Sequence, residues 1–330
     1  MVIKLLELFG GIGAPRCALR NLGVTVKSID YVEIDEKAVR SYNAMFKQEL
    51  PYKAQDIREW NKAQDIRKWS LKTDILVHGS PCQDFSIAGY QKGADEGSGT
   101  RSSLMWETLK IIEGMGPCKP KIVIWENVKN VLSKSMYHNF KKYLDCMEKL
   151  GYTNSYQILD ARDFGLPQAR QRVFTVSILG GVKFDFSKMA KRPMKPISEL
   201  LESETDSHYE VTQPSMIKKI VGNDNSSFGG RVSVIKDFAY TITCKQMRCP
   251  NSGVIDLGNG KYRYLTEKEC FRLQGYTDKD FEAAASVTPG KQGKLNGALY
   301  KQAGNSIPVT IFESMFEVML KEVFECEFNI

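Results

Sequence analysis

The sequence contains no apolar run of the roughly 18 residues that a helix needs to span a bilayer, and only three of its 330 residues are histidine. Its opening segment, MVIKLLELF, is too short and too acidic for a secretory signal and is typical of a first buried strand. No segment repeats at the period of a solenoid. These absences argue against a membrane protein, an exported protein and a repeat protein, and they predict a soluble cytoplasmic chain.

Clustered cysteines are also missing. The eight cysteines are scattered, and the one close pair, Cys244 and Cys249, has no histidine near it. In a chain without an export signal, scattered cysteines predict reduced thiols rather than disulfides. A zinc site needs several Cys or His ligands at short spacing, so we expect no bound metal.

What the sequence does have is the composition of an ordinary globular protein, with 42% hydrophobic and 26% charged residues. This composition excludes a disordered chain, and 330 residues are enough for two domains. The net charge of +7 suits a polyanionic partner such as nucleic acid without requiring one.

Apolar runs alternate with amphipathic helical patterns through residues 1–180. This alternation predicts an α/β fold with a mainly parallel sheet covered by helices on both faces. Residues 181–285 are richer in polar residues and short β-like runs, so a second, smaller domain is expected there. An amphipathic helix over Val309–Phe324 is expected to pack back onto the first domain, which residues 286–330 complete.

A glycine-rich turn, Phe9-Gly10-Gly11-Ile12-Gly13, follows the first predicted strand, and Glu33 ends the second. In Rossmann-like folds such a turn makes room for a nucleotide, and an acidic residue at the end of the second strand binds a ribose hydroxyl. The dinucleotide fingerprint needs a third glycine where this chain has Arg16, which favours a nucleoside cofactor without a pyrophosphate. A glycine turn that binds no ligand has the same pattern.

Three more groups of polar residues follow predicted strands. Cys82 comes after the strand at 74–77, Glu126 after the strand at 121–125, and Arg170 and Arg172 alternate at the start of a later strand. Open α/β sheets bind ligands at the carboxyl ends of their strands. Cys82 is therefore a candidate nucleophile, Glu126 its acid or hydrogen-bonding partner, and the arginines suit a phosphate or a carbonyl oxygen. A buried structural thiol and a salt-bridged surface strand have similar local patterns.

Taken together, these residues resemble one known family. Its motifs appear here, in order and over nearly the whole chain, as Pro81-Cys82-Gln83, Glu126-Asn127-Val128, Gln168-Ala169-Arg170-Gln171-Arg172, the segment 263–275 and Gly304-Asn305-Ser306. The set is similar to that of the DNA cytosine carbon-5 methyltransferases, of the single-specificity bacterial or phage type. The resemblance implies a Rossmann-like S-adenosylmethionine-dependent catalytic domain and a smaller β-rich target-recognition domain at 181–285.

The resemblance also implies the catalytic roles. Cys82 would attack carbon 6 of a cytosine flipped out of the duplex, and Glu126, in its protonated form, would contact ring nitrogen 3. Arg172 would hold the carbonyl oxygen of the base, and Arg170 would support the loop and the thiolate. Methylation at carbon 5 would then be followed by loss of the carbon 5 proton and release of Cys82.

For the cofactor, S-adenosylmethionine with S-adenosylhomocysteine as product, the resemblance implies a pocket with no metal. Its lining would be Phe9, Gly11, Gly13, Glu33, Ile34, Asp56, Ile57, Pro81, Leu104 and Asn305. The octapeptide at 53–60 recurs with one change at 62–69, so either Asp56 or Asp65 could bind the adenine amino group. We favour Asp56, because residues 51–56 fit a third strand.

For the nucleic acid, the resemblance implies duplex DNA with a short recognition sequence. The loop at 84–99 would close over the flipped base, with contacts from Ser86 to Gln91. Thr241 lies in the Thr-aliphatic signature of the recognition domain, and Lys245 and Arg248 would reach phosphates or a guanine edge. A monomer in the cytoplasm of a bacterium or a phage-infected cell is expected, with a cognate restriction endonuclease as a partner that need not bind it.

Three other functions share part of this pattern. A transfer-RNA branch of the same family shares the catalytic motifs, but the large segment with the Thr-aliphatic signature favours DNA. A catalytically inert DNA-binding protein would not need Cys82, Glu126, Arg170 and Arg172 together. A flavin or nicotinamide oxidoreductase would explain only the glycine turn.

Overall fold

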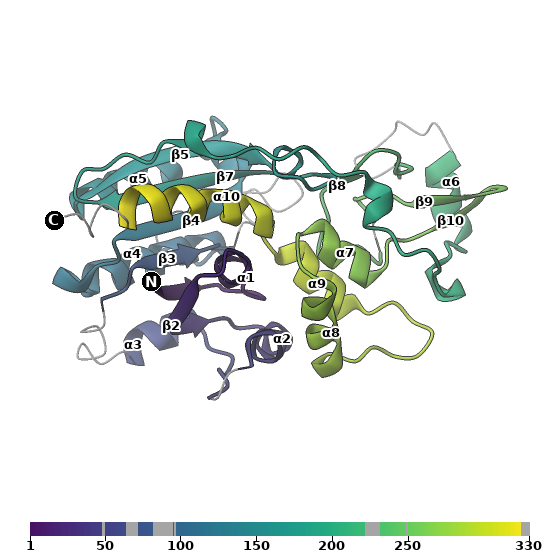
Figure 1. The fold of residues 1–330 in the computed structure, drawn as a ribbon, viewed down its shortest axis with the longest axis horizontal. Helices are drawn as coiled ribbons and strands as arrows, with labels where there is room; N and C mark the ends of the chain where they lie inside the picture. The colour runs from purple at the N-terminus through teal and green to yellow at the C-terminus, as the bar shows by residue number, and fades with distance from the viewer. Residues whose placement is uncertain are drawn as a thin grey trace.

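A computed structural model describes residues 1–47, 50–63, 72–81, 95, 97–221, 232–248 and 250–324. Its centre is a six-stranded sheet in the order β2-β1-β3-β4-β7-β5 (Figure 1). The strands are β1 (Val2–Leu8), β2 (Thr25–Val32), β3 (Ile75–His78), β4 (Ile122–Val128), β5 (Tyr152–Asp160) and β7 (Gln171–Leu179). The β2-β1-β3-β4 part is parallel, and β7 runs antiparallel to both β4 and β5. The mainly parallel α/β sheet expected from the sequence is confirmed.

Helices cover both faces of the sheet. They are α1 (Ala14–Asn21), α2 (Glu36–Phe46), α3 (Ile57–Ala63), α4 (Met105–Gly114), α5 (Tyr137–Lys149) and α10 (Val309–Met319). Leu5 and Ile124 pack in the apolar cluster that includes α1 and α10, whereas Leu6 and Trp125 pack in the cluster that includes α4 and α5. Successive strand residues point to opposite faces, which is why these strands are apolar at nearly every position. As expected, the C-terminal helix lies across the sheet (Figure 1).

The polar middle of the chain forms a sparser structure at the other end of the molecule (Figure 1). It contains α6 (Pro214–Val221), the two-residue strand β8 (Ala239–Tyr240), and the hairpin of β9 (Ile255–Gly258) and β10 (Lys261–Arg263). Strand β8 pairs with β6 (Gln168–Ala169), which directly precedes β7. A small apolar cluster of its own contains Val211, Val232, Val254 and Tyr264.

Three helices connect this segment to the sheet. Helices α7 (Glu267–Leu273), α8 (Asp278–Val287) and α9 (Gly297–Asn305) contribute to the same apolar cluster as α1 and α10. Asp280 on α8 pairs with Arg20 on α1 at 2.8 Å. These helices therefore hold the polar segment in a fixed place beside the sheet.

One strand expected from the sequence does not form. Residues 51–56 have no regular structure, although the Gln55 N–H donates to the Glu33 carbonyl at 2.8 Å. Pro51 lacks an N–H, so it cannot contribute a donor to a strand ladder. The segment nevertheless runs beside the end of β2.

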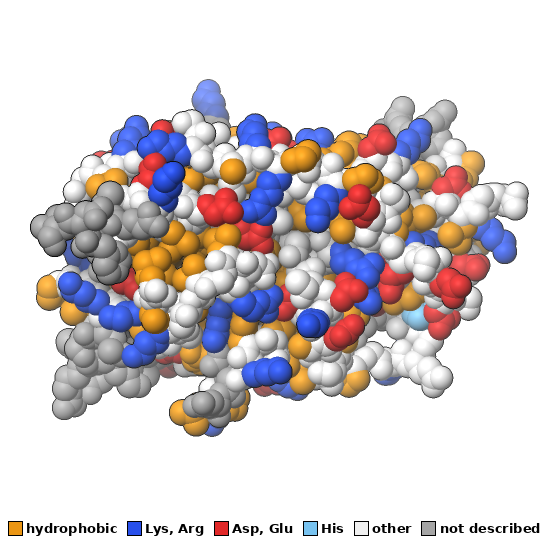
Figure 2. Space-filling model, viewed as in Figure 1, with side chains coloured by type: hydrophobic (Ala, Val, Ile, Leu, Met, Phe, Trp, Pro, Cys, Tyr) orange, Lys and Arg blue, Asp and Glu red, His pale blue; other side chains and the backbone are white. Residues whose placement is uncertain are grey.

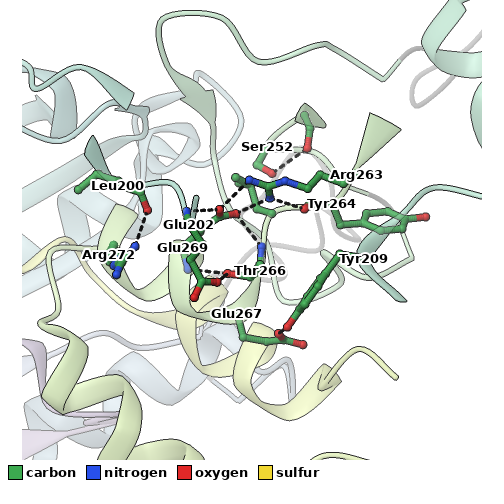
Figure 3. A network of polar contacts seen from close by, with 12 residues as sticks. Leu200, Glu202, Tyr209, Ser252, Arg263, Tyr264, Thr266, Glu267, Glu269 and Arg272 are labelled. Atoms are coloured by element: carbon green, nitrogen blue, oxygen red, sulfur yellow. Dashed lines mark hydrogen bonds and ion pairs between the residues drawn. The ribbon is translucent and has the colours of Figure 1, made fainter. Parts of the chain in front are cut away.

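A buried ion pair organises the start of α7 (Figure 3). Glu269 is fully buried and accepts two hydrogen bonds from Arg263, both at 2.8 Å. Its carboxylate also accepts from the backbone N–H groups of Thr266 and Glu202, and the Thr266 hydroxyl in turn accepts from the Glu269 N–H. This reciprocal capping fixes where α7 begins. The pair therefore joins strand β10 to the helices that pack on the sheet.

Replacing Glu269 with alanine is expected to lower the free energy of unfolding by about 3 kcal/mol, because it leaves the Arg263 guanidinium buried without its carboxylate. Urea unfolding of the variant measures the loss. Exposed Glu282 on α8 is the matched control, and Glu282→Ala should change the unfolding free energy by less than about 0.5 kcal/mol. A double variant, Arg263→Met with Glu269→Ala, should be less destabilised than Glu269→Ala alone, because no guanidinium is then left buried without a partner; a double variant that is no more stable would contradict the buried-charge explanation.

Candidate active site

The polar motifs found in the sequence meet at one edge of the sheet. The turn 9–13 follows β1, residues 79–81 follow β3, and Glu126 and Asn127 lie at the end of β4. Because β1, β3 and β4 are parallel and adjacent, their carboxyl ends share this edge. The sheet thus brings the glycine turn and the acidic motif to the same place as the segment that leads into Cys82.

The segment between β3 and Cys82 is held by side chains from β4. The Asn127 Nδ2 donates to the Ser80 carbonyl oxygen at 3.3 Å, and the Trp125 Nε1 donates to the Ser80 Oγ at 3.0 Å. Ser80 is 3% exposed, so both hydrogen bonds lie in the protein interior. Cys82 itself lies outside the described residues, and the structure therefore describes its chain only as far as Pro81.

Glu126 lies between these two anchoring residues and points to the other face of β4. Its carboxyl is 9% exposed, and its Oε1 lies 3.1 Å from Arg172 Nε. Burial raises the pKa of Glu126, whereas the positive charges of Arg172 and Arg170 act to lower it. A carboxyl group whose proton is favoured by burial and opposed by arginines can change its protonation during a reaction.

The two arginines of the same motif, Arg170 and Arg172, have different partners. Arg172 adjoins the Glu126 carboxyl. Arg170 is 3% exposed and donates to the carbonyl oxygens of Ile242, Gly304 and Ser306, at 2.9, 3.1 and 2.7 Å. These bonds tie the start of β7 to the segment after β8 and to the end of α9. The geometry thus gives Arg170 a positioning role, for which no local sequence pattern exists.

Two further residues of the sequence motifs, Gln168 and Gly304, lie at this junction. Gln168 is fully buried, donates to the Leu273 carbonyl and accepts from the Ile242 N–H. Gly304 has no space for a side chain, since a Cβ there would overlap the backbone of Thr243 and Cys244. Both residues lie where the strand motif, the polar segment and α9 converge. Their position within the family motifs is the sequence signal that could have identified them as positioning residues.

The glycine turn after β1 is shaped by an aromatic stack beneath it. Phe9, Gly11 and Gly13 all have positive φ angles, a region that side chains with a Cβ rarely adopt. A Cβ on Gly13 would lie 2.6 Å from the Tyr42 ring. The Tyr31 hydroxyl donates to the Gly11 carbonyl at 2.5 Å, and the rings of Tyr31 and Tyr42 stack at 3.8 Å. The turn is therefore fixed before any ligand arrives.

Glu33 is held at this turn by three backbone donors. Its Oε2 accepts from the Gly11 N–H at 3.0 Å, and its Oε1 accepts from Ile34 and Asp35, each at 2.8 Å. Burial raises the pKa of the carboxyl, and these hydrogen bonds oppose the rise. Because a carboxylate oxygen can accept two hydrogen bonds, Oε2 retains capacity for a ribose hydroxyl. The Ile34 side chain beside it is 66% exposed and offers an apolar surface to an adenine ring.

This arrangement fits a nucleoside cofactor: a preformed turn, a fixed carboxylate and an exposed aliphatic side chain lie together. The other candidate cofactor residues come from several segments of the chain. Asp56 comes directly after the Gln55 contact to Glu33, and its carboxylate pairs with Arg58 at 2.6 Å. Ile57 is buried, Pro81 and Leu104 are half-buried, and Asn305 is exposed at the end of α9. Asp65 lies outside the described residues.

The candidate nucleic-acid contacts are described only in part. The Thr241 Oγ1 donates to the Ala169 carbonyl at 2.8 Å, directly beside Arg170. Lys245 and Arg248 are exposed in one turn, closed by a backbone hydrogen bond between them. Ser86 and Gln91 lie outside the described residues. In the view of Figure 2, basic and acidic side chains alternate over the surface, so charge alone does not locate a binding face.

The described residues contain neither a metal-binding cluster nor a membrane-spanning helix. Within the described ranges, no group of three or more His, Cys, Asp or Glu side chains has the arrangement of a metal site. Among the helices that the structure describes, none has the length and hydropathy of a membrane span.

Comparison with known proteins identifies relatives over the whole chain. The family model for C-5 cytosine-specific DNA methylase matches residues 3–321. The type II methyltransferase M2.ScrFI of Lactococcus lactis subsp. cremoris is 40% identical over 257 residues, which cover 75% of this chain and 67% of that protein. The type II methyltransferase M.DsaV of Dactylococcopsis salina is 29% identical over 331 residues, 97% of this chain and 87% of that protein.

Solved structures support the fold. The Dnmt2 methyltransferase of S. pombe has a TM-score of 0.74 at 18% identity, with 100% of both chains covered. The methyltransferase EhMeth of Entamoeba histolytica has a TM-score of 0.77 at 18% identity, with 98% of this chain and 99% of that chain covered. The sequence relatives carry the assignment further: this chain belongs to the family of C-5 cytosine-specific DNA methylases, which transfer a methyl group from S-adenosylmethionine to carbon 5 of cytosine in DNA.

Proposed function

We propose that this chain methylates a cytosine flipped out of a short recognition sequence in duplex DNA, with Cys82 as the nucleophile and Glu126 as the acid. The observation that carries the proposal is the buried Glu126 carboxyl, 3.1 Å from Arg172 and on the strand that anchors Ser80, two residues before Cys82. A cytosine ring bound between these groups would contact a nucleophile (Cys82), a proton donor (Glu126) and a cation (Arg172) at the same time.

The chemistry needs each of these groups. Carbon 5 of cytosine is a poor nucleophile while the ring is aromatic. The Cys82 thiolate forms a bond to carbon 6, and Glu126 gives its proton to nitrogen 3, so that the electron pair becomes available at carbon 5. Arg172 binds the carbonyl oxygen of the ring and stabilises the developing negative charge. S-Adenosylmethionine, when bound, supplies the methyl group to carbon 5 and leaves as S-adenosylhomocysteine.

The adduct then resolves in one elimination. A water molecule takes the proton from carbon 5, and the electron pair of that C–H bond reforms the double bond between carbons 5 and 6. The bond between Cys82 and carbon 6 breaks, and the sulfur leaves as thiolate. Glu126 recovers its proton from nitrogen 3. The enzyme thus returns to its starting state.

The cofactor pocket is proposed at the turn after β1. Phe9, Gly11 and Gly13 would surround the ligand, the Glu33 carboxylate would accept from the ribose hydroxyls, and Ile34 would pack on the adenine. The remaining contacts are proposed from Asp56, Ile57, Pro81, Leu104 and Asn305. Support comes from the three backbone donors that fix Glu33 at 2.8–3.0 Å, because a fixed acceptor binds a hydroxyl without loss of side-chain entropy.

Replacing Asp56 with alanine is expected to weaken S-adenosylmethionine binding about tenfold, because the adenine amino group loses a charged acceptor. The hydrogen bond from Arg58 lowers the pKa of Asp56, so the carboxylate is ionised at neutral pH. Calorimetric titration of the cofactor measures the affinity, with Asp65→Ala as the control from the second octapeptide copy. Loss of affinity in Asp65→Ala alone would assign the role to the other copy.

Residues 181–285 are proposed as the target-recognition domain, and residues 1–180 with 286–330 as the catalytic domain. The separate apolar cluster around Val254 supports an independent function for this segment. Thr241, Lys245 and Arg248, together with Ser86 and Gln91 from the loop after Cys82, are the proposed DNA contacts. We propose that the protein acts as a monomer. We place it in the cytoplasm of a bacterium or a phage-infected cell, since its sequence relatives include proteins of a bacterium and of a Bacillus phage. A cognate restriction endonuclease would recognise the same DNA sequence without binding to this protein.

The test is transfer of a labelled methyl group from S-adenosylmethionine to mixed-sequence duplex DNA, with transfer RNA in parallel. After digestion to nucleosides, the label is expected in 5-methylcytosine from DNA, at one sequence context. Label in RNA alone would recast residues 181–285 as an RNA-binding segment. Absence of label in both would favour an inert DNA-binding protein.

A further inference from the structure

Trp125 and Asn127, the two neighbours of Glu126 on β4, both donate hydrogen bonds to Ser80, which lies two residues before Cys82. We propose that Ser80 and Trp125 form a positioning pair, which fixes the chain that carries Cys82 relative to the Glu126 carboxyl. The inference rests on the proposed function of Cys82 and Glu126. It adds a hydrogen bond between two side chains, neither of which contacts the base or the cofactor in the mechanism above.

The alternation of side chains along β4 explains how two of its residues reach Ser80. Trp125 and Asn127 point to one face of the strand and Glu126 to the other. The Trp125 indole N–H donates to the Ser80 Oγ, and the Asn127 amide donates to the Ser80 carbonyl oxygen. On the opposite side, a Cβ on Gly79 would lie 3.7 Å from Glu126 Oε2. Ser80 is thus held by two residues of one strand, and Gly79 lies beside the carboxyl of the residue between them.

Ser80 lies close to Cys82 in the sequence. One residue separates them, and this residue is Pro81, whose ring fixes φ near −65°. A displacement of Ser80 would therefore be passed on to the nucleophile. A misplacement of about 1 Å in reacting groups costs on the order of a hundredfold in rate.

The indole that anchors Ser80 is itself immobilised. Trp125 is 1% exposed and contacts Tyr143 with ring centroids 4.3 Å apart. His78, on β3 two residues before Ser80, lies parallel to the indole, and its Nε2 hydrogen-bonds the Tyr143 hydroxyl at 3.0 Å. Burial lowers the pKa of His78 to about 3, so this layer is uncharged at neutral pH. The indole N–H is thereby presented from a rigid, apolar support.

The pair can be tested with three variants: Ser80→Ala, Trp125→Phe and the double variant. Each single change is expected to lower kcat for methyl transfer about tenfold, while KM for S-adenosylmethionine changes by less than about twofold. Because both residues act through one hydrogen bond, the double variant should be no slower than the slower single variant. A kcat that stays within about twofold of wild type in both single variants would overturn the inference.

A matched control separates positioning from folding. Tyr152 makes a buried hydrogen bond of the same kind, 2.7 Å from its hydroxyl to the Pro120 carbonyl, at the start of β5. Tyr152→Phe should lower stability without lowering kcat. If Tyr152→Phe slows methyl transfer as much as Ser80→Ala, the effect is one of folding and the inference fails.

A second measurement separates this inference from the proposed function. The rate at which iodoacetamide alkylates Cys82 is followed by mass spectrometry of its peptide, without DNA. This rate should differ between wild type and Ser80→Ala but not between wild type and Tyr152→Phe. If wild type fails to methylate DNA while Cys82 reactivity still depends on Ser80, the proposed function fails and the positioning pair stands. Equal alkylation rates in all variants, with DNA methylation intact, would contradict the pair alone.

Discussion

Methyl transfer to DNA is expected to fall by a factor on the order of 10⁴–10⁶ when Cys82 is replaced with alanine, because carbon 5 then stays part of an aromatic ring. Cofactor affinity should be unchanged, since the proposed ribose and adenine contacts come from the turn after β1 and from Glu33 and Ile34. Single-turnover transfer of a labelled methyl group measures the rate, and calorimetric titration measures the affinity.

A trapped adduct gives the same prediction a structural readout. With 5-fluorocytosine in the recognition sequence, carbon 5 carries no proton for the elimination step, so the bond between Cys82 and carbon 6 should persist. Wild type should run as a covalent complex with the duplex in denaturing electrophoresis, and Cys82→Ala should not. Cys118→Ala and Cys146→Ala, at half-buried free thiols, are controls that should trap the duplex normally. Methyl transfer retained in Cys82→Ala would show that the nucleophile is another group.

The sequence was informative wherever a short segment carries its own signal. Apolar runs followed by Gly-Ser-Pro-Cys or by Glu-Asn-Val predict polar residues at the carboxyl ends of strands, and β1, β3 and β4 bring those ends together. The pattern could not show that β7 runs antiparallel between β4 and β5, because a strand buried on both faces is apolar in either direction.

Contacts between residues far apart in the chain could not be predicted from the sequence, for a similar reason. Arg170 finds its acceptors at Ile242, Gly304 and Ser306, which are 72 to 136 residues away in the chain. Nothing in the local pattern distinguishes this buried arginine from Arg172, which has the same strand context and adjoins Glu126. The hydrogen bond from Trp125 to Ser80 likewise joins β4 to the segment after β3, across 45 residues. Such contacts depend on the packed fold, which no local pattern encodes.

The second large effect is expected at Glu126. Glu126→Gln should lower kcat by a factor on the order of 10²–10⁴, because the amide can hydrogen-bond nitrogen 3 but cannot transfer a proton to it. The amide is nearly isosteric and stays beside Arg172, so folding and DNA affinity should change little. Single-turnover rates at saturating DNA measure the loss. Glu59→Gln, at a carboxyl 73% exposed, is the matched control and should leave kcat unchanged.

The pH dependence of the rate distinguishes an acid from a merely charged group. Burial raises the pKa of Glu126, so the protonated form extends to higher pH than in a free carboxyl, against the opposing charges of Arg172 and Arg170. As pH rises through that pKa, Glu126 loses its proton and kcat should fall. The wild-type profile should therefore have an alkaline limb. In Glu126→Gln the alkaline limb should disappear, because the amide has no proton to lose over this range. An alkaline limb that persists in the variant would assign it to another group and remove Glu126 as the acid.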